Sequence, residues 1–181
     1  HVPSRVLIIL DEAYYEFAKF QSNYPDSMHY RYDNVITLRT FSKAQGLAGF
    51  RVGYGFADEK LIDNLMKVKL PFEPSSLGQH AACAAMDDLN HLDNSIKLNY
   101  EQKIRLKNFF KTNNFSYIPS ATNFITLTFE SQKLAEDFSN KMLFKGVILR
   151  HLIGFGLPNC VRVTIGLKDE NDFLIKNIQE I

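Results

Sequence analysis

A run of five aliphatic residues that ends abruptly in two carboxylates most constrains how this chain folds. Val6–Leu10 contains only Val, Leu and Ile, and Asp11 and Glu12 follow it directly. A short unbroken apolar run of this length is typical of a strand covered on both faces of a parallel sheet. We therefore predict a buried strand over residues 6–10, with Asp11 and Glu12 at its carboxyl end.

The following residues predict further strands and a capped helix. Residues 35–38 and 51–56 are rich in the residues that strands prefer, and Tyr24–Asp26 indicates a polar loop or a short helix before them. Asp58 has the side chain of an N-cap, with apolar residues at helical spacing after it. We predict a helix from Asp58 to about Lys69.

After Lys69 the chain continues with a further helix and then changes in texture, from about Asn94. Ser75 or Ser76 opens a helix with a small-residue face, and residues 96–110 carry a long helical pattern of basic and apolar residues. Shorter elements follow, with strands predicted at 123–129, 147–152 and 160–165 and helices at 131–144 and 169–181. This succession predicts an α/β domain over residues 1–94 and a smaller α+β domain over residues 95–181.

Composition excludes several classes of protein. The chain has 181 residues, 45% of them hydrophobic, and a formal net charge of +1, so we expect no nucleic-acid or membrane partner. Its two cysteines make no disulfide framework and fit a reducing cytoplasm, and we expect no metal site. The opening His1-Val2-Pro3, without an initiator Met or signal peptide, indicates a chain entered midway through a domain.

The segment between the second and third predicted strands carries the most chemistry. Residues 40–51, the Lys43 loop, combine two hydroxyls, one lysine, two glycines and an arginine. We expect a small-residue, partly apolar loop to desolvate Lys43 and make a neutral amine accessible for Schiff-base chemistry. Thr40, Ser42 and Arg51 supply donors and a fixed cation suited to a phosphate, and Gly46 and Gly49 allow close backbone turns. The alternative is an ordinary solvated loop without a ligand. A nucleotide-binding loop is excluded, because the segment lacks the glycine spacing that such a loop requires.

Two further segments carry candidate site residues. Asp11, at the end of a strand, lies where open α/β sheets bind ligands. Its carboxylate could pair with the nitrogen of a bound pyridine ring, and Tyr14 could hydrogen-bond a phenolic oxygen of the same ring. Ordinary helix capping by Asp11 is the alternative. Arg162 interrupts an apolar strand and needs an anion, either a substrate carboxylate or the carboxylate of a structural ion pair.

Together these segments resemble the histidinol-phosphate aminotransferase family, within the fold-type I aminotransferases that use pyridoxal 5′-phosphate (PLP). The resemblance covers nearly the whole chain in the order and spacing of the family. Its lysine motif is highly specific, and the flanking motifs are individually weaker. The matching residues are Asp11–Tyr14, Thr40–Ala44, Gly46–Tyr54, Pro119–Ser120, Asn123–Phe124, Gly146–Arg150, Gly154–Asn159 and Arg162–Gly166.

The resemblance implies a fold and a role for each matching residue. It implies the C-terminal part of the large PLP-binding α/β domain, followed by the small C-terminal α+β domain. Lys43 would form the Schiff base with PLP and then shuttle the proton. Asp11 would pair with the pyridine nitrogen and Tyr14 with the ring oxygen. The phosphate would be held by Thr40, Ser42 and Arg51.

The same resemblance implies the substrates and the oligomer. Arg162 would bind the carboxylate or phosphate of the substrate, and Arg150 is a second candidate for a substrate anion or a structural pair. The activity would transfer an amino group between histidinol phosphate or an aromatic amino acid and 2-oxoglutarate, in a cytoplasmic homodimer. Two alternatives share these motifs, a PLP-dependent threonine-phosphate decarboxylase-like lyase and a catalytically silent module of the same fold.

The chain departs from the family in two residues and in length. Gln45 stands where an aromatic residue is frequent, and Glu73 where Asn is common. Members of the family are about twice as long, so the resemblance implies a C-terminal half that binds PLP weakly by itself.

Overall fold

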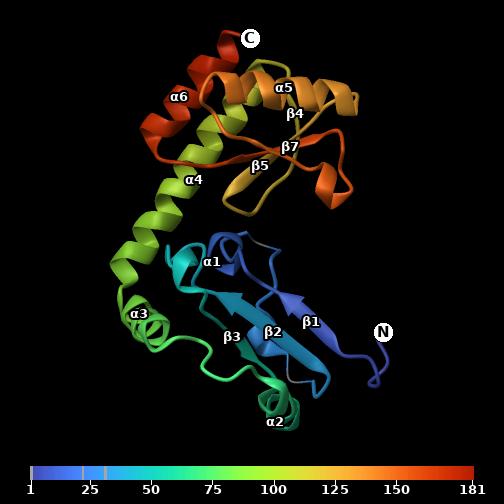
Figure 1. Cartoon of the computed structure of the whole chain (residues 1–181), viewed down its shortest axis with the longest axis vertical. Helices are drawn as coiled ribbons and strands as arrows, with labels where there is room; N and C mark the ends of the chain where they lie inside the picture. Colours follow the sequence, from blue (N-terminus) through green and yellow to red (C-terminus); the bar gives the residue numbers. More distant parts are fainter. Residues whose placement is uncertain (1, 22, 31) are drawn as a thin grey trace. The chain divides into compact units, whose positions relative to one another are not determined.

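The computed structural model describes residues 2–21, 23–30 and 32–181. His1, Ser22 and Arg31 lie outside the described residues. The chain divides into two compact units, His1–Ile96 and Lys97–Ile181 (Figure 1).

The first unit contains a three-stranded sheet in the order β1-β2-β3. β1 (Ile8–Asp11) pairs in parallel with β2 (Val35–Thr40), and β3 (Gly53–Phe56) pairs antiparallel with β2. All three predicted strands are confirmed with shifted bounds. The third begins later than predicted because Arg51 has a left-handed backbone, with φ of 54°, which a strand does not accommodate.

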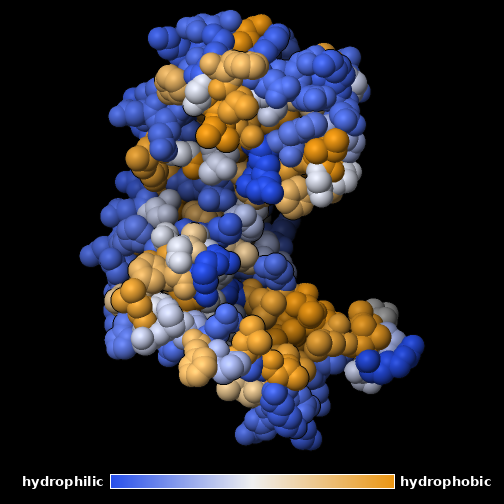
Figure 2. Space-filling model, in the orientation of Figure 1, coloured by the Kyte–Doolittle hydropathy of each residue, from blue (hydrophilic) through white to orange (hydrophobic). Residues whose placement is uncertain are grey.

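One face of this sheet corrects the prediction that the first strand is buried on both sides. Ile9 is 59% exposed, and Leu7 and Val6 just before the strand are 46% and 42% exposed. Figure 2 shows hydrophobic side chains gathered over the three-stranded sheet. β1 is an edge strand of this sheet, and the described residues do not cover Ile9. The apolar run therefore predicted the strand correctly and its burial wrongly.

Helices of the first unit begin at the residues that the sequence predicts. α2 (Glu59–Val68) is capped by Asp58, whose Oδ1 accepts the Lys60 N–H at 3.0 Å. α3 (Ser76–Asp87) is capped by Ser75, whose Oγ accepts the Gly78 N–H at 3.1 Å. The shorter elements are α1 (Tyr15–Ala18) and the 3-10 turns η1 (Ser27–His29) and η2 (Ala48–Phe50).

The second unit is an antiparallel sheet in the order β4-β5-β7-β6 with helices packed on it. Its strands are β4 (Ser116–Ile118), β5 (Phe124–Thr128), β6 (Arg150–His151) and β7 (Cys160–Thr164). Its core is one apolar cluster, with Leu106, Phe110, Ile125, Leu127, Met142 and Val161 fully buried.

Three helices and a 3-10 turn complete the described part of the chain. α4 (Leu89–Thr112) runs from the end of the first unit into the second, and α5 (Gln132–Phe144) and α6 (Lys168–Gln179) follow. η3 (Ile153–Phe155) lies between β6 and β7. β4 was not predicted, and the strand predicted at 147–152 is reduced to two residues. Among the described residues, every helix is too short or too polar to cross a bilayer.

Lys103 on α4 is a buried cation in the second unit, 8% exposed. Burial, assisted by the charge of Lys107, lowers the pKa of its ammonium group from 10.5 to about 8. The unfolded lysine therefore holds its proton more tightly than the folded one. The resulting loss of stability is complete below about pH 8 and is relieved as the pH rises toward 10.5.

We expect Lys103→Met to raise the free energy of unfolding at neutral pH by up to roughly 3 kcal/mol. The variant should also lose the rise in stability that the native chain shows above about pH 8. Urea denaturation at neutral pH and again above about pH 8 measures the effect. Lys97→Met, at an exposed position of the same helix, is the control. An unchanged pH slope in Lys103→Met would show that another group causes it.

The uncovered sheet face is expected to make the chain self-associate, because a contiguous exposed apolar surface favours contact with another one. Sedimentation velocity over a range of concentrations should show association that Ile9→Lys reduces. Phe144→Lys, at a 92% exposed position of the second unit, is the matched control. A native chain that stays monomeric throughout would contradict this expectation.

Candidate active site

The Lys43 loop is anchored by two buried side chains on either side of its polar ones. Phe41, 4% exposed, packs in a cluster with Val52 and Ala82. Ala44, 1% exposed, packs with Phe17. Lys43, between these anchors, is exposed. The sequence Phe-Ser-Lys-Ala thus presents its lysine outward. The described residues leave Lys43 exposed, contrary to the prediction that the loop removes it from water.

The loop closes in a tight turn after Lys43. The Gly46 N–H donates to the Lys43 carbonyl at 3.0 Å, and the Leu47 N–H donates to the Phe41 carbonyl at 2.9 Å. Gly46 has a φ of 74°, which disfavours any residue with a Cβ. Gly49, by contrast, has no positive φ and open space where a Cβ would stand. Only one of the two glycines is therefore required by the backbone.

The two hydroxyls of the loop are linked to one another. Thr40 Oγ1 donates to Ser42 Oγ at 2.9 Å and accepts the Ser42 N–H at 3.1 Å. Arg51 lies further along, where its left-handed backbone ends η2 and its Nη1 donates to the Ala48 carbonyl at 2.8 Å. This arrangement supplies two hydroxyls and a guanidinium, all donors suited to a phosphate.

Asp11 lies beside the loop at the end of β1, and its side chain is exposed. Its Oδ1 accepts the Ala13 N–H at 3.0 Å, which closes a local turn. The cap residue of α1 is Tyr14, so the alternative that Asp11 caps this helix is wrong. Tyr14 lies next to the lysine, with its ring centroid 5.3 Å from Lys43 Nζ.

A hollow of about 290 Å³ brings the predicted cofactor residues together. Asp11 and Lys43 line it, with the hydroxyl and guanidinium donors around them. Its lining residues are Asp11, Ala13, Leu38, Arg39, Thr40, Ser42, Lys43 and Arg51. Six predicted residues from two stretches of sequence, 11–14 and 40–51, are thus gathered at one edge of the sheet, with Tyr14 counted through its contact with Lys43.

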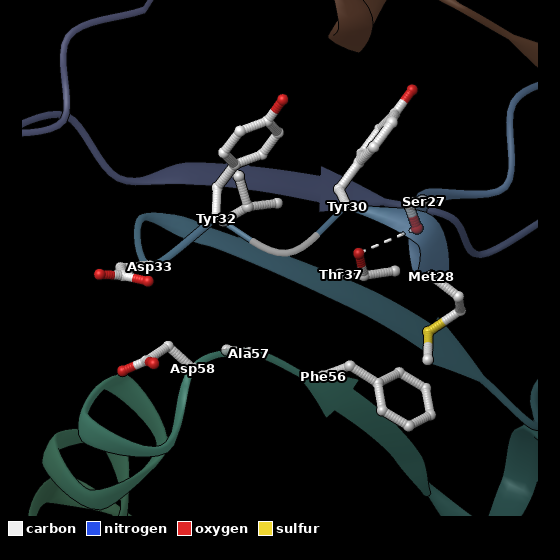
Figure 3. A pocket seen from close by; sticks show the side chains of 10 residues that line it. Ser27, Met28, Tyr30, Tyr32, Asp33, Thr37, Phe56, Ala57 and Asp58 are labelled. Atoms are coloured by element: carbon white, nitrogen blue, oxygen red, sulfur yellow. Dashed lines mark hydrogen bonds between the residues drawn. The ribbon is translucent and has the colours of Figure 1, made fainter.

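A larger pocket of about 370 Å³ in the same unit has a different character (Figure 3). Two carboxylates, Asp33 and Asp58, stand among tyrosines and Phe56, and Asp58 already caps α2. Thr37 Oγ1 donates to Ser27 Oγ across it at 2.9 Å. Its described lining residues include no lysine or arginine, so volume does not identify the chemical site here.

In the second unit the two candidate substrate arginines stand side by side. Arg150 on β6 and Arg162 on β7 are direct register partners, which places both side chains on one face of the sheet. Each guanidinium lies over an aromatic ring, Arg150 at 5.0 Å from Phe155 and Arg162 at 5.1 Å from Phe124. Arg162 Nε is buried without a hydrogen-bond partner.

No carboxylate of the described residues forms a salt bridge with either arginine. The structural ion pair that the sequence left open is therefore absent from this part of the chain. Like charges directly opposite one another destabilise a strand pair. The arrangement fits an anion supplied by a ligand.

Sequence reasoning missed a network of charged residues on the other side of the strand ends. Arg39 Nε and Nη2 both donate to Glu12 Oε2, at 3.0 and 2.9 Å, and Nη2 also donates to Asp26 Oδ1 at 3.0 Å. The alternation of side chains along a strand could have predicted this network. Glu12 follows Asp11 and Arg39 precedes Thr40, so both must point away from the face that carries these two site residues.

Gln45, which departs from the family pattern, has a buried Oε1 without a hydrogen-bond partner.

Comparisons with known proteins agree with this arrangement. The sequence model of the family described as aminotransferase class I and II matches residues 2–178. The chain belongs to this family. It is 41% identical to the histidinol-phosphate aminotransferase of Bacillus subtilis (strain 168), over 99% of this chain and 50% of that protein. A histidinol-phosphate aminotransferase 2 of Pseudomonas aeruginosa is 40% identical, with 99% and 48% covered.

A solved structure shows the same fold. It is the histidinol-phosphate aminotransferase of Sinorhizobium meliloti in complex with pyridoxal-5′-phosphate, which matches with a TM-score of 0.89 and 29% identity. The match covers 99% of this chain and 49% of that one. The chain therefore spans about half the length of the relatives it matches, and its mixed α/β fold is that of the fold-type I aminotransferases.

Gly46→Ala is expected to destabilise the first unit by about 1–2 kcal/mol, because alanine is strained at a left-handed backbone position. Gly49→Ala is the matched control and should change stability little, since its Cβ meets no atom within 4 Å. Urea denaturation compares the two. Equal stability of both variants would show that the turn after Lys43 adapts without glycine.

Proposed function

We propose that this protein is a PLP-dependent aminotransferase, or the part of one that carries its reactive lysine. The observation that carries the proposal is the hollow at the ends of β1 and β2, where one amine meets a carboxylate and a set of phosphate donors. Membership of the aminotransferase class I and II family supports it.

The residues present fit PLP chemically. The cofactor has an aldehyde that needs an amine, a pyridine nitrogen that gains from a nearby carboxylate, and a phosphate that needs donors. Lys43, Asp11 and Arg51 supply these three kinds of group in one hollow, with Thr40 and Ser42 as further donors. When bound, PLP supplies an electron sink for the charge that develops at the substrate Cα.

The roles of the side chains follow from their chemistry. Lys43 would attach the cofactor and then hold and return the proton that leaves Cα, since a freed amine is a general base. Asp11 would keep the pyridine nitrogen protonated. Tyr14, in contact with Lys43, would donate to the ring oxygen. The Thr40 and Ser42 hydroxyls and the Arg51 guanidinium would hold the phosphate.

The paired arginines of the second unit support an anionic substrate. Arg162, with its buried unpartnered Nε, would bind the main anionic group, and Arg150 beside it would add a second cation. A phosphate carries more charge than a carboxylate and suits two guanidiniums. Together with the names of the relatives, this favours histidinol phosphate over an aromatic amino acid as amino donor, with 2-oxoglutarate as acceptor.

The remaining expectations concern the whole protein. The division into a PLP-binding part at 1–94 and a small domain at 95–181, the homodimer and the cytoplasmic location all belong to this proposal. Because the chain spans about half the length of its relatives, and Asp11, Lys43 and Arg51 are exposed, we propose that PLP binding by these residues alone is weak.

Reduction with borohydride tests the role of Lys43, because it traps an imine as a stable adduct that peptide mapping by mass spectrometry locates. With PLP at limiting concentration, the native chain should carry the adduct selectively on Lys43, and Lys43→Ala should lose it. Lys67→Ala, at an exposed lysine of α2, is the control and should leave the adduct in place. Adducts spread evenly over the lysines would contradict the proposal.

Amino transfer is a separate measurement on the same chain. Enzymes typically turn over about 1–1,000 substrate molecules per second. With PLP, histidinol phosphate and 2-oxoglutarate, we expect this chain to form glutamate at a small fraction of that rate. Rapid turnover by this chain alone would overturn the expectation that it binds PLP weakly. Carbon dioxide release from an amino-acid substrate, without amino transfer, would instead indicate the decarboxylase.

A further inference from the structure

The ends of β1 and β2 present different chemistry on their two faces. Asp11 and Glu12 are consecutive, as are Arg39 and Thr40, and successive residues of a strand point to opposite faces. The parallel register pairs Asp11 with Leu38, and the Glu12 N–H continues the ladder by donating to the Leu38 carbonyl at 2.9 Å. Asp11 and Thr40 thus share the face of the hollow, and Glu12 and Arg39 share the other.

On that other face Arg39 joins three separate segments. Two of its nitrogens donate to Glu12 Oε2, after β1, and one donates to Asp26 Oδ1, before η1. Its guanidinium carbon lies 3.5 Å from the ring centroid of Tyr15 on α1. The Tyr15 hydroxyl in turn donates to Asp26 Oδ2 at 2.9 Å. We call these four residues the Arg39 network.

The Arg39 network is enclosed and charge-assisted. The side chains of Arg39 and Glu12 are only 10% and 8% exposed. Burial opposes the charge of Arg39, but the hydrogen bonds to Glu12 and Asp26 and the negative charge of Glu12 outweigh it and raise the pKa of the guanidinium. The Met28 N–H and, more weakly, Tyr15 and Arg39 lower the pKa of Asp26. Breaking the pair between Arg39 and Glu12 would leave a buried charge without a partner, which opposes rearrangement of the network.

We propose that the Arg39 network positions the cofactor site, with Arg39 and Glu12 as positioning residues. Arg39 also lines the hollow, but its guanidinium donates to Glu12 and Asp26 and is not assigned to the cofactor or the substrate. The inference rests on the proposed function. Glu12 holds the backbone next to Asp11, and Arg39 holds the backbone next to Thr40, from which the Lys43 loop starts. The network fixes the distance between the pyridine partner and the lysine, on which a reaction across one ring depends.

The two hydrogen bonds to a single oxygen give a sharp test. Glu12→Gln keeps a carbonyl oxygen that can accept both Arg39 donors but removes the charge, whereas Glu12→Ala removes the acceptor. The PLP concentration for half-maximal borohydride-trapped adduct at Lys43 is the readout, with the thermal midpoint without PLP measured in parallel. We expect Glu12→Ala to raise that concentration about tenfold or more. Glu12→Gln should stay within about threefold of the native chain.

Arg39→Lys gives a second variant in case Glu12→Ala does not fold. Lysine keeps the charge but has one nitrogen and no planar fork, so it should weaken adduct formation like Glu12→Ala. Arg105→Lys is the matched control, because Arg105 forms an ion pair with Asp172 in the second unit. It should leave the adduct at Lys43 unchanged.

The outcomes separate positioning from other roles. A lower thermal midpoint with native adduct formation in Glu12→Ala and Arg39→Lys would overturn the proposal in favour of stability alone. Equal losses in Glu12→Gln and Glu12→Ala would overturn it in favour of a purely electrostatic role. If the native chain and Lys43→Ala form the same adducts, the proposed function itself fails. The Glu12 variants do not test that function, so the two failures are distinguishable.

Discussion

The parallel pairing of β1 with β2 is the constraint on which the rest of the site depends. Parallel strands end at the same edge of a sheet, so Asp11 and the start of the Lys43 loop meet although 28 residues lie between Asp11 and Thr40 in the sequence. Antiparallel pairing would place the carboxylate and the lysine at opposite edges. The Arg39 network then joins the same two strand ends from the other side.

The first unit combines a rigid frame with exposed chemistry. Phe41 and Ala44 are buried anchors, and Arg39 is enclosed among its partners, yet Lys43, Asp11 and Arg51 are all exposed. Water solvates these exposed charges and screens their interactions. The residues that we propose to hold PLP therefore lie around one hollow, while the described residues do not supply the enclosure that would strengthen their electrostatic interactions.

The second unit combines an apolar core with two like charges on neighbouring strands. Its core is built from fully buried aliphatic and aromatic side chains, which stabilise the sheet enough to tolerate two arginines directly opposite one another. Stacking over Phe124 and Phe155 offsets part of that repulsion. A bound anion would offset the remainder, which is why we propose that this strand pair binds the substrate.

Local chemistry in the sequence determined the elements and most of the candidate site. Asp58 and Ser75 have the side chains that cap helices, and the aliphatic run before Asp11 has the character of a strand. The lysine motif made Lys43 the candidate reactive residue. Only the tertiary structure decided the rest. That Ile9 is uncovered, that Arg150 faces Arg162 and that Arg39 bonds both Glu12 and Asp26 are properties of strand neighbours and register. Residues far apart in sequence create them, so no local pattern of hydrophobicity or charge encodes them alone.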